Sequence, residues 1–290
     1  MIVIKIGGAR AVDPAGALTD IAALVKSNAE GGDRDAEDVV VVHGGSTAVD
    51  DTLGRLGIEP KYVETPSGVT GRFTDAETME VFEMVMPGLV NTELVAALRS
   101  EGVDAVGLSG VDGGLLYGPR KSAVRVVEDG KQKIRRGDHS GTPREVNTDL
   151  LAGLVSDGYT PVVSPPMAGA EDGEARAAVT PVNTDADRAA AAIAGALDAT
   201  LLLLTDVPGI LEDAGDRDTL VREVDDPAEW DRLESVVTGG MGRKVMAAEE
   251  ALDGGAAEVV IADANIDRPV MTALEGDGTH IYPGALEGDT

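Results

Sequence analysis

The sequence predicts an α/β fold, a three-layer αβα sandwich with a mainly parallel central sheet. Short apolar runs of strand length alternate along the chain with longer segments of helical periodicity, the pattern of a parallel sheet covered by helices on both faces. Aromatic residues make up only 2% of the 290 residues, so the core has to be built from aliphatic side chains. In such folds functional residues are expected at the carboxyl ends of the strands.

The elements follow one another from the first residues. Runs of Val, Ile and Leu predict strands at residues 2–6, 39–43, 103–108, 159–163, 200–204 and 259–262, and a short one near Ile281. Apolar residues at helical spacing predict helices at residues 13–27, 46–56, 75–86, 89–100, 147–156, 183–197, 227–233 and 241–252. Pro87 and Gly88 are expected to stop the helix before them, and Asn183 or Thr184 to cap the alanine-rich helix.

Composition excludes several classes of function. The formal net charge of −28, from 52 acidic and 24 basic residues, disfavours general binding to nucleic acid or to anionic membranes. The acidic residues are spread through helices and loops, which indicates a salt-adapted, halophilic surface. Because the chain has no cysteine, begins with a strand and has no apolar run near the roughly 20 residues that span a bilayer, we expect a cytoplasmic protein.

Two strands run directly into glycine pairs. The first strand ends in Gly7-Gly8 and the second in His43-Gly44-Gly45. Backbone N–H groups without neighbouring side chains can approach anionic oxygens closely, so both turns indicate a phosphate-handling site. The Walker A and GxGxxG patterns are absent, which requires another nucleotide-binding fold. For His43 itself, a hydrogen-bonded residue at a strand end is the favoured interpretation.

One basic segment stands out in this acidic chain. A β-hairpin is predicted over residues 120–136, because three valines precede the turn Glu128-Asp129-Gly130 and Ile134 follows it. An edge strand protected by charge is the alternative, but acidic residues would protect an edge equally well, so we favour a surface that recognises an acidic partner. The basic side chains proposed for this surface are Arg120, Lys121, Lys131, Lys133, Arg135 and Arg136.

The strand ends carry a set of motifs in a fixed order. These are KIGG at residue 5, HGG at 43, GRFTD at 71, NTDAD at 183, TDVPGI at 205 and GGMGRK at 239. In this order they resemble the amino acid kinase family along nearly the whole chain. The finer resemblance is to the N-acetylglutamate kinase branch and, through RFTDAET at residue 72 and the basic hairpin, to kinases acting on glutamate or 2-aminoadipate attached to the carrier protein LysW. In such enzymes the carrier is acidic.

The resemblance implies three catalytic residues. Lys5 and Lys244 would stabilise the transition state from opposite sides of the phosphoryl group, and Asp187 would organise both lysines. Lys5 ends an otherwise apolar strand, which makes a surface lysine the weaker interpretation. Lys244 is expected in the first turn of its helix, where a solvated residue is the alternative, and Asp187 could simply be an acid in a first helical turn.

The resemblance also implies the binding residues. Gly44, Gly45, Arg72 and Asn183 would bind the substrate, and Gly7, Gly8, Thr205 and Asp206 the nucleotide and its phosphates. A surface arginine, a helix cap for Asn183 and a simple turn at Asp206 are the structural alternatives. Residues 1–199 would form an N-terminal lobe for substrate and carrier, and residues 200–290 a C-terminal lobe for ATP.

These observations lead to one predicted activity with two alternatives. The prediction is ATP-dependent phosphorylation of the side-chain carboxylate of LysW-linked glutamate or 2-aminoadipate, in arginine or lysine biosynthesis. A carboxylate is already an anion, so no general base is needed, and Mg²⁺ would be held mainly by phosphates and water with no protein metal site. The alternatives are a kinase of free N-acetylglutamate and a non-catalytic nucleotide-binding regulator. The resemblance further implies a homodimer.

Overall fold

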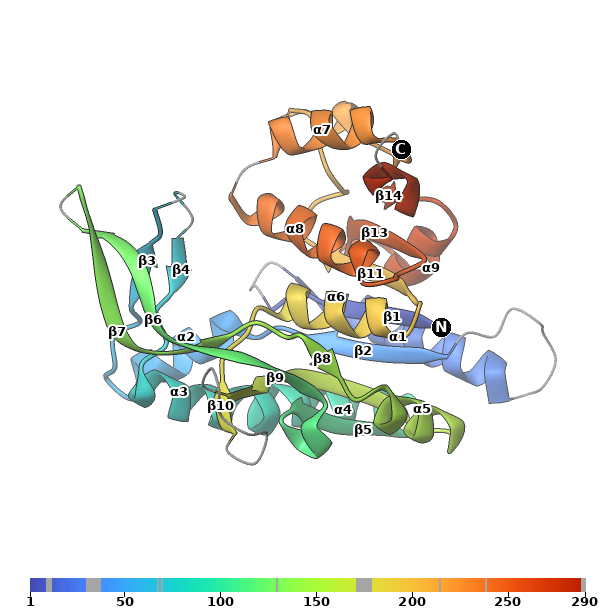
Figure 1. The fold of residues 1–290 in the computed structure, drawn as a ribbon. Helices are drawn as coiled ribbons and strands as arrows, with labels where there is room; N and C mark the ends of the chain where they lie inside the picture. The colour runs from blue at the N-terminus through green and yellow to red at the C-terminus, as the bar shows by residue number, and fades with distance from the viewer. Residues whose placement is uncertain are drawn as a thin grey trace.

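The computed structural model describes residues 1–8, 12–29, 38–66, 68, 70–128, 130–170, 179–213, 215–237 and 239–287. A mixed sheet of twelve strands runs through these residues, and helices cover both of its faces (Figure 1). The predicted α/β fold with a mostly parallel central sheet is confirmed. A second, antiparallel sheet consists of β3 (Tyr62–Glu64) and β4 (Thr70–Arg72).

The centre of the large sheet is parallel. β1 (Ile2–Ile6) lies between β2 (Val39–His43) and β11 (Thr200–Thr205), β13 (Glu258–Asp263) continues the sheet beyond β11, and β9 (Thr160–Ala170) lies between β2 and β5 (Ala105–Gly110). The remaining strands are β6 (Leu116–Glu128), β7 (Lys131–Gly141), β8 (Glu145–Val146), β10 (Thr180–Val182), β12 (Glu223–Val224) and β14 (Thr279–Ile281). Because β1, β2 and β11 are parallel, their carboxyl ends meet at one edge of the sheet.

Alternation along the strands builds a core on each face. Val3 and Leu203 point into one core, which they share with α5 (Thr148–Ser156), α6 (Ala186–Ala196), α7 (Pro227–Val236) and α8 (Gly239–Asp253). Ile4 and Leu202 point into the other, which includes α1 (Ala15–Ala29), α4 (Asn91–Ser100) and α9 (Pro269–Leu274). The pairing of β1 with β11 carries the sheet without a break across residue 199, so both proposed lobes share the two cores.

The predicted stop at Pro87 is wrong. α3 (Ala76–Glu83), a π-helical segment (Met84–Val90) that contains Pro87, and α4 join into one helix. The wider π-turn accommodates a residue that lacks an N–H, so the helix continues past the proline. By length and composition alone this 25-residue helix could cross a membrane. Leu94 and Leu98 are buried in the core below the sheet, and Val85 and Met86 pack with α2 (Ser46–Arg55), as in a core helix.

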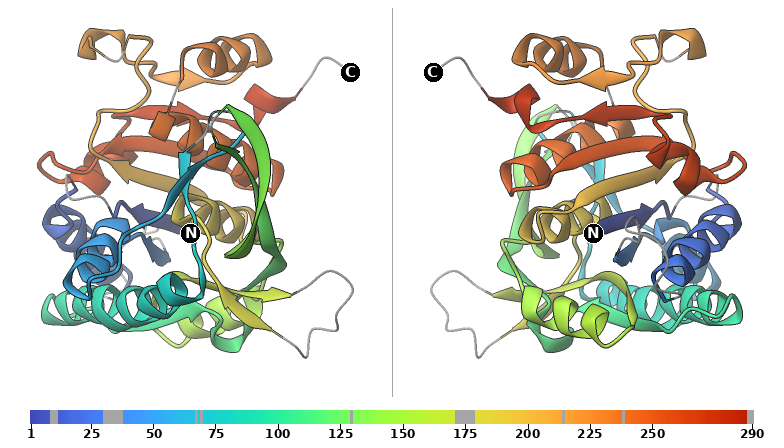
Figure 2. Two further views of the ribbon diagram at one scale, coloured as in Figure 1. Left: turned by 90° about the vertical axis from the view of Figure 1, so that its left-hand side faces the viewer. Right: turned by 90° about the vertical axis from the view of Figure 1, so that its right-hand side faces the viewer.

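The predicted basic hairpin is present. β6 and β7 pair antiparallel, with Val124 opposite Arg135 and Glu128 opposite Lys131. Asp129 of the predicted turn lies outside the described residues. The hairpin projects at one end of the molecule beside β3 and β4 (Figures 1 and 2). The basic segment is therefore held out from the sheet, next to the loop that carries Arg72.

Candidate active site

Three charged side chains meet above the carboxyl end of β1. The Nζ atom of Lys5 lies 2.6 Å from Oδ1 of Asp187, and the Nζ atom of Lys244 lies 3.1 Å from Oδ2 of the same carboxylate. Lys5 is only 5% exposed and Asp187 only 7%. The structure thus brings residues from β1, α6 and α8 around one buried carboxylate.

The electrostatics of this cluster favour an additional anion. Burial would raise the pKa of the Asp187 carboxyl, but the charges of Lys5 and Lys244 outweigh burial and hold that pKa well below its usual range. Burial, followed by the charge of Lys5, lowers the pKa of Lys244 despite its contact with Asp187. Two ammonium groups around one carboxylate give these three side chains a net positive charge, although the charge of Asp185 also acts on Lys244. A positive cluster suits the charge that develops on a transferring phosphoryl group.

Two closely packed helices position Asp187 and Lys244. The side chain of Asp185 accepts a hydrogen bond from the Asp187 amide at 2.8 Å and caps α6. The expected cap at Asn183 or Thr184 is therefore wrong. α8 begins at Gly239, which puts Lys244 in the second turn instead of the predicted first turn.

The α6–α8 contact requires small residues. A Cβ atom on Gly195 of α6 would lie 2.9 Å from the Cα atom of Gly254, just beyond α8. Arg188 of α6 also donates from Nε to Glu250 of α8 at 2.8 Å. Close packing and this ion pair fix the helix that carries Lys244 to the helix that carries Asp187.

The two glycine turns pack against each other. The Gly44 amide donates to the carbonyl of Ile6 at 3.1 Å, and a Cβ atom on Gly8 would lie 2.0 Å from the Gly45 nitrogen. Gly45 directly precedes α2, a ten-residue helix whose amino-terminal end faces this layer. Glycine is required here by close backbone approach. Because the Gly44 amide is already bonded to Ile6, a small anion at this layer would have to bind the other N–H groups.

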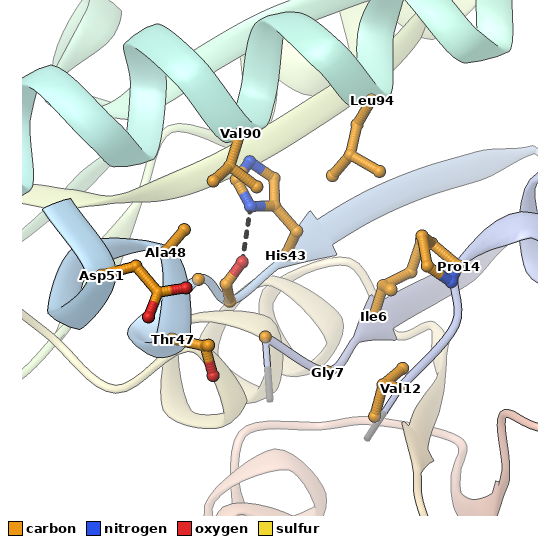
Figure 3. A pocket seen from close by; sticks show the side chains of 13 residues that line it. Ile6, Gly7, Val12, Pro14, His43, Thr47, Ala48, Asp51, Val90 and Leu94 are labelled. Atoms are coloured by element: carbon orange, nitrogen blue, oxygen red, sulfur yellow. Dashed lines mark hydrogen bonds between the residues drawn. The ribbon is translucent and has the colours of Figure 1, made fainter. Parts of the chain in front are cut away.

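A pocket of about 310 Å³ lies on the far side of this glycine layer (Figure 3). It is lined by Ile6, Gly7, Gly8, Val12, Pro14, His43, Gly44, Gly45, Thr47, Ala48, Asp51, Val90 and Leu94. Because neighbouring residues of a strand point to opposite faces, Ile6 faces this pocket while Lys5 faces α6. The pocket and the cluster around Asp187 therefore share the glycine turns as a common wall.

His43 is a buried hydrogen-bonded residue. Its Nδ1 lies 2.9 Å from the carbonyl oxygen of Gly44, and its Nε2 lies 3.0 Å from Nδ2 of Asn91. A carbonyl only accepts and an amide nitrogen only donates, so the ring is neutral with its proton on Nδ1. Burial lowers the pKa of His43 to about 4, helped by the nearby charge of Lys5 and opposed by the Gly44 carbonyl.

Arg72 is held by a network that the sequence did not reveal. Its Nη1 lies 2.6 Å from Oδ1 of Asp50, and its Nη2 donates to the Tyr62 hydroxyl at 3.0 Å and to the Ser46 carbonyl at 3.4 Å. The guanidinium also lies over the Tyr62 ring, 5.1 Å from its centre. Arg72 therefore lies at the amino-terminal end of α2, beside the Gly44-Gly45 turn.

Asn183 binds the loop that follows Arg72. Its Nδ2 donates to the Thr74 hydroxyl at 2.9 Å, and its backbone bonds to His139 and Gly141 of β7. The side chain of Asn183 thus contacts Thr74, two residues after Arg72, and does not cap α6. Thr74 belongs to the GRFTD motif but was given no role from the sequence, and Asp138, which bonds to it, lies in no motif, because contacts between distant segments leave no local pattern.

The predicted nucleotide residues lie at the end of β11. The Thr205 hydroxyl, almost fully buried, donates to the exposed Asp206 carboxylate at 3.2 Å. Asp263, at the end of the adjacent β13, pairs with Arg217 at 2.9 Å. Sequence reasoning missed this ion pair, since Arg217 lies in a long loop. Among the described residues no group of three or more His, Asp or Glu side chains is arranged to hold a metal ion.

The basic hairpin side chains are largely exposed. Lys121, Lys131, Lys133 and Arg136 are exposed, whereas Arg120 and Arg135 are half-buried. Lys133 pairs with Glu128 at 3.0 Å. The guanidinium of Arg135 lies over the ring of Phe73, 4.5 Å from its centre. Two of the few aromatic residues in the chain thus carry an arginine on their faces beside the site.

Comparisons with known proteins agree with this arrangement. The chain is 43% identical over 285 residues to a [LysW]-aminoadipate kinase of Thermus thermophilus, covering 96% of this chain and 99% of that protein. It is 46% identical over 249 residues to an acetylglutamate kinase of Methanopyrus kandleri, with 85% and 92% covered. It is 39% identical over 248 residues to a [LysW]-aminoadipate/[LysW]-glutamate kinase of Saccharolobus solfataricus, with 85% and 89% covered.

The fold has solved counterparts. The carbamate kinase of Giardia superimposes with a TM-score of 0.64 at 17% identity, over 97% of this chain and 98% of that one. The model of the amino acid kinase family matches residues 1–263, which contain every motif described above. With this match, and with relatives similar over almost their full length, the chain belongs to the amino acid kinase family.

Proposed function

We propose that this chain is an ATP-dependent kinase that phosphorylates the side-chain carboxylate of glutamate or 2-aminoadipate carried on a LysW-type amino-group carrier protein. The product is an acyl phosphate, used in arginine or lysine biosynthesis. The observation that carries the proposal is the convergence of Lys5 and Lys244 on Asp187 in a buried, net positive cluster. The names of the relatives support the substrate.

Positioning and charge neutralisation account for the chemistry. An oxygen of the substrate carboxylate attacks the γ-phosphorus of ATP, the bond to the bridging oxygen breaks, and ADP leaves with the electron pair. Lys5 and Lys244 neutralise charge on the transferring group from two sides, while Asp187 holds both ammonium groups in place. Mg²⁺, which would be held mainly by phosphates and water, would supply further positive charge.

Binding is divided between the two lobes. In residues 1–199, Arg72 and Asn183, with the Gly44-Gly45 turn, bind the amino acid. In residues 200–290, Thr205 and Asp206 bind the nucleotide, while Gly7 and Gly8 of the N-terminal lobe approach its phosphates. The two glycine turns, Thr205 and Asp206 all follow the carboxyl ends of the adjacent parallel strands β1, β2 and β11, which supports one shared site for the two substrates.

The basic hairpin distinguishes the proposal from its nearest alternative. A kinase of free N-acetylglutamate, as the Methanopyrus relative is named, needs no surface for a carrier. The exposed side chains Lys121, Lys131, Lys133 and Arg136 form such a surface in a chain of net charge −28. A regulator without catalytic activity is disfavoured, because it would not need two buried lysines at one carboxylate.

The test is an acyl-phosphate trapping assay in molar KCl. Hydroxylamine converts the product to a hydroxamate, and the assay compares free N-acetylglutamate with carrier-linked glutamate and carrier-linked aminoadipate. We expect turnover of a carrier-linked substrate, a large loss with Lys131→Gln/Lys133→Gln, and little change with the control Lys26→Gln. Turnover of the free compound alone would reject the carrier. Light scattering on the same preparation, at several KCl concentrations, tests whether this proposed cytoplasmic enzyme is a homodimer that is stable in concentrated salt.

A further inference from the structure

Thr74 joins the two proposed substrate-binding side chains to β7. Its amide donates to Oδ1 of Asp138 at 3.1 Å, its carbonyl accepts from the His139 amide at 2.7 Å, and its hydroxyl accepts from Asn183 at 2.9 Å. Thr74 is completely buried and lies two residues after Arg72. Every polar group of Thr74 is therefore bonded to β7 or to Asn183.

Asp138 is the charged residue in this hydrogen-bond network. It lies on β7, is 1% exposed, and accepts from the Thr74 amide and from the Ser140 hydroxyl. Burying a carboxylate is costly, whereas a neutral side chain could also accept these bonds at a lower cost. An ionised acceptor holds an N–H about twice as strongly as a neutral one, so Asp138 ties the loop firmly to the strand.

The same loop meets the hairpin a second time. The Phe73 ring, 4% exposed, lies under the Arg135 guanidinium, 4.5 Å from it. Arg135 also approaches Glu128 at 3.9 Å and belongs to the proposed carrier surface. Phe73 and Thr74 therefore contact the hairpin at its basic surface and at its buried base.

We propose that Asp138 is a positioning residue. It couples occupancy of the basic hairpin to residues 72–74, the segment that carries Arg72 and contacts Asn183. An acidic carrier that engages Arg135 and Arg136 restrains β7, and Asp138 and His139 pass this restraint through Thr74 to Arg72 and Asn183. Docking then further restrains the segment that binds the linked amino acid. This inference rests on the proposed carrier function, and its test separates the two.

The experiment uses Asp138→Asn with Asp112→Asn as the matched control. Asp112, two residues after β5, also accepts from a backbone amide and a serine hydroxyl, both of Ser109, at 2.7 and 3.0 Å, but unlike Asp138 it is exposed. Calorimetry measures binding of the carrier without its amino acid, and hydrogen exchange follows the peptide 70–78. In wild type and in Asp112→Asn, we expect the carrier to slow exchange in this peptide about tenfold or more.

In Asp138→Asn the carrier should still bind within about threefold of wild type, because Asp138 is buried away from it. The slowing of exchange should be lost, and the KM for the carrier-linked substrate should rise about fivefold while the KM for ATP is unchanged. If Asp138→Asn does not fold, Phe73→Leu removes the second contact and should reduce the same slowing. Carrier binding that leaves exchange at 70–78 unchanged overturns the coupling alone. Absence of carrier binding to wild type overturns the carrier function as well.

Discussion

Replacing Asp187 with asparagine tests the central cluster most directly. Asp187 Oδ1 lies 2.6 Å from Lys5 and Oδ2 lies 3.1 Å from Lys244. With an effective dielectric constant of about 20, Coulomb's law gives about 6 and about 5 kcal/mol for these contacts, and desolvation offsets much of both. Removing one partner of a buried ion pair costs about 3–5 kcal/mol, and here the variant leaves two ammonium groups facing each other. We expect Asp187→Asn to lower the free energy of unfolding by that amount.

Urea denaturation at neutral and at high pH, at constant KCl, measures this loss. The pKa of Lys244 is already lowered by burial and by Lys5, and without Asp187 it falls further. Lys244 then releases its proton as the pH rises, so the loss in stability should shrink at high pH. The double variant Asp187→Asn/Lys244→Met removes the repulsion and should be about 1–3 kcal/mol more stable than Asp187→Asn. The reasoning would be refuted if Asp187→Asn unfolded with a free energy within about 1 kcal/mol of wild type. It would also be refuted if the double variant were less stable than Asp187→Asn.

Three further predictions concern the surroundings of the cluster. Because the pKa of His43 is about 4 when folded and 6.5 when unfolded, the unfolded state binds more protons between these values. Stability should therefore fall by about 3 kcal/mol as the pH drops through this window, and His43→Gln should remove that slope in denaturation curves. Arg72→Lys cannot reproduce the contacts with both Asp50 and Tyr62, so initial rates should show a KM for the amino acid raised about tenfold or more, with the KM for ATP unchanged. Gly8→Ala places a Cβ 2.0 Å from Gly45 and should lower the thermal midpoint, whereas Gly54→Ala, with nothing within 4 Å, should raise it.

The sequence predicted the parallel sheet because its strands are unbroken runs of apolar residues. It predicted the hairpin because a turn separates a run rich in valine from a second run that contains Ile134, and both runs carry basic residues. It missed features that depend on contacts between distant segments. Three capping residue types stand together at 183–185, and Asp185 became the cap because Thr74 occupies Asn183. Pro87 was expected to end a helix, but the packing of Val85 and Met86 on α2 holds the chain helical as a π-turn.

The candidate site was predictable to a different degree. Motif order indicated Lys5, Asp187 and Lys244, and the structure brings these side chains together. The Asp50 and Tyr62 partners of Arg72 were not predictable, since Asp50 is one of many acidic residues on exposed helices in this chain. In so acidic a sequence, no local sequence pattern distinguishes a carboxylate that binds a functional arginine from the other acidic residues. Only the three-dimensional structure identifies Asp50 as the partner of Arg72.

The net charge of −28 makes one last prediction about an acidic carrier. Beyond a Debye length the whole chain repels such a partner, while at contact the basic hairpin attracts it. The Debye length is about 10 Å at 0.1 M salt and about 3 Å at 1 M, so concentrated salt screens the repulsion but leaves the contact pairs. We therefore expect stopped-flow association to accelerate by about tenfold between these concentrations, the reverse of an ordinary basic binding surface. The double variant Lys131→Gln/Lys133→Gln should weaken carrier binding at both salt concentrations. Association that slows as KCl increases would mean that the field of the hairpin governs approach and that the acidic surface plays no part in it.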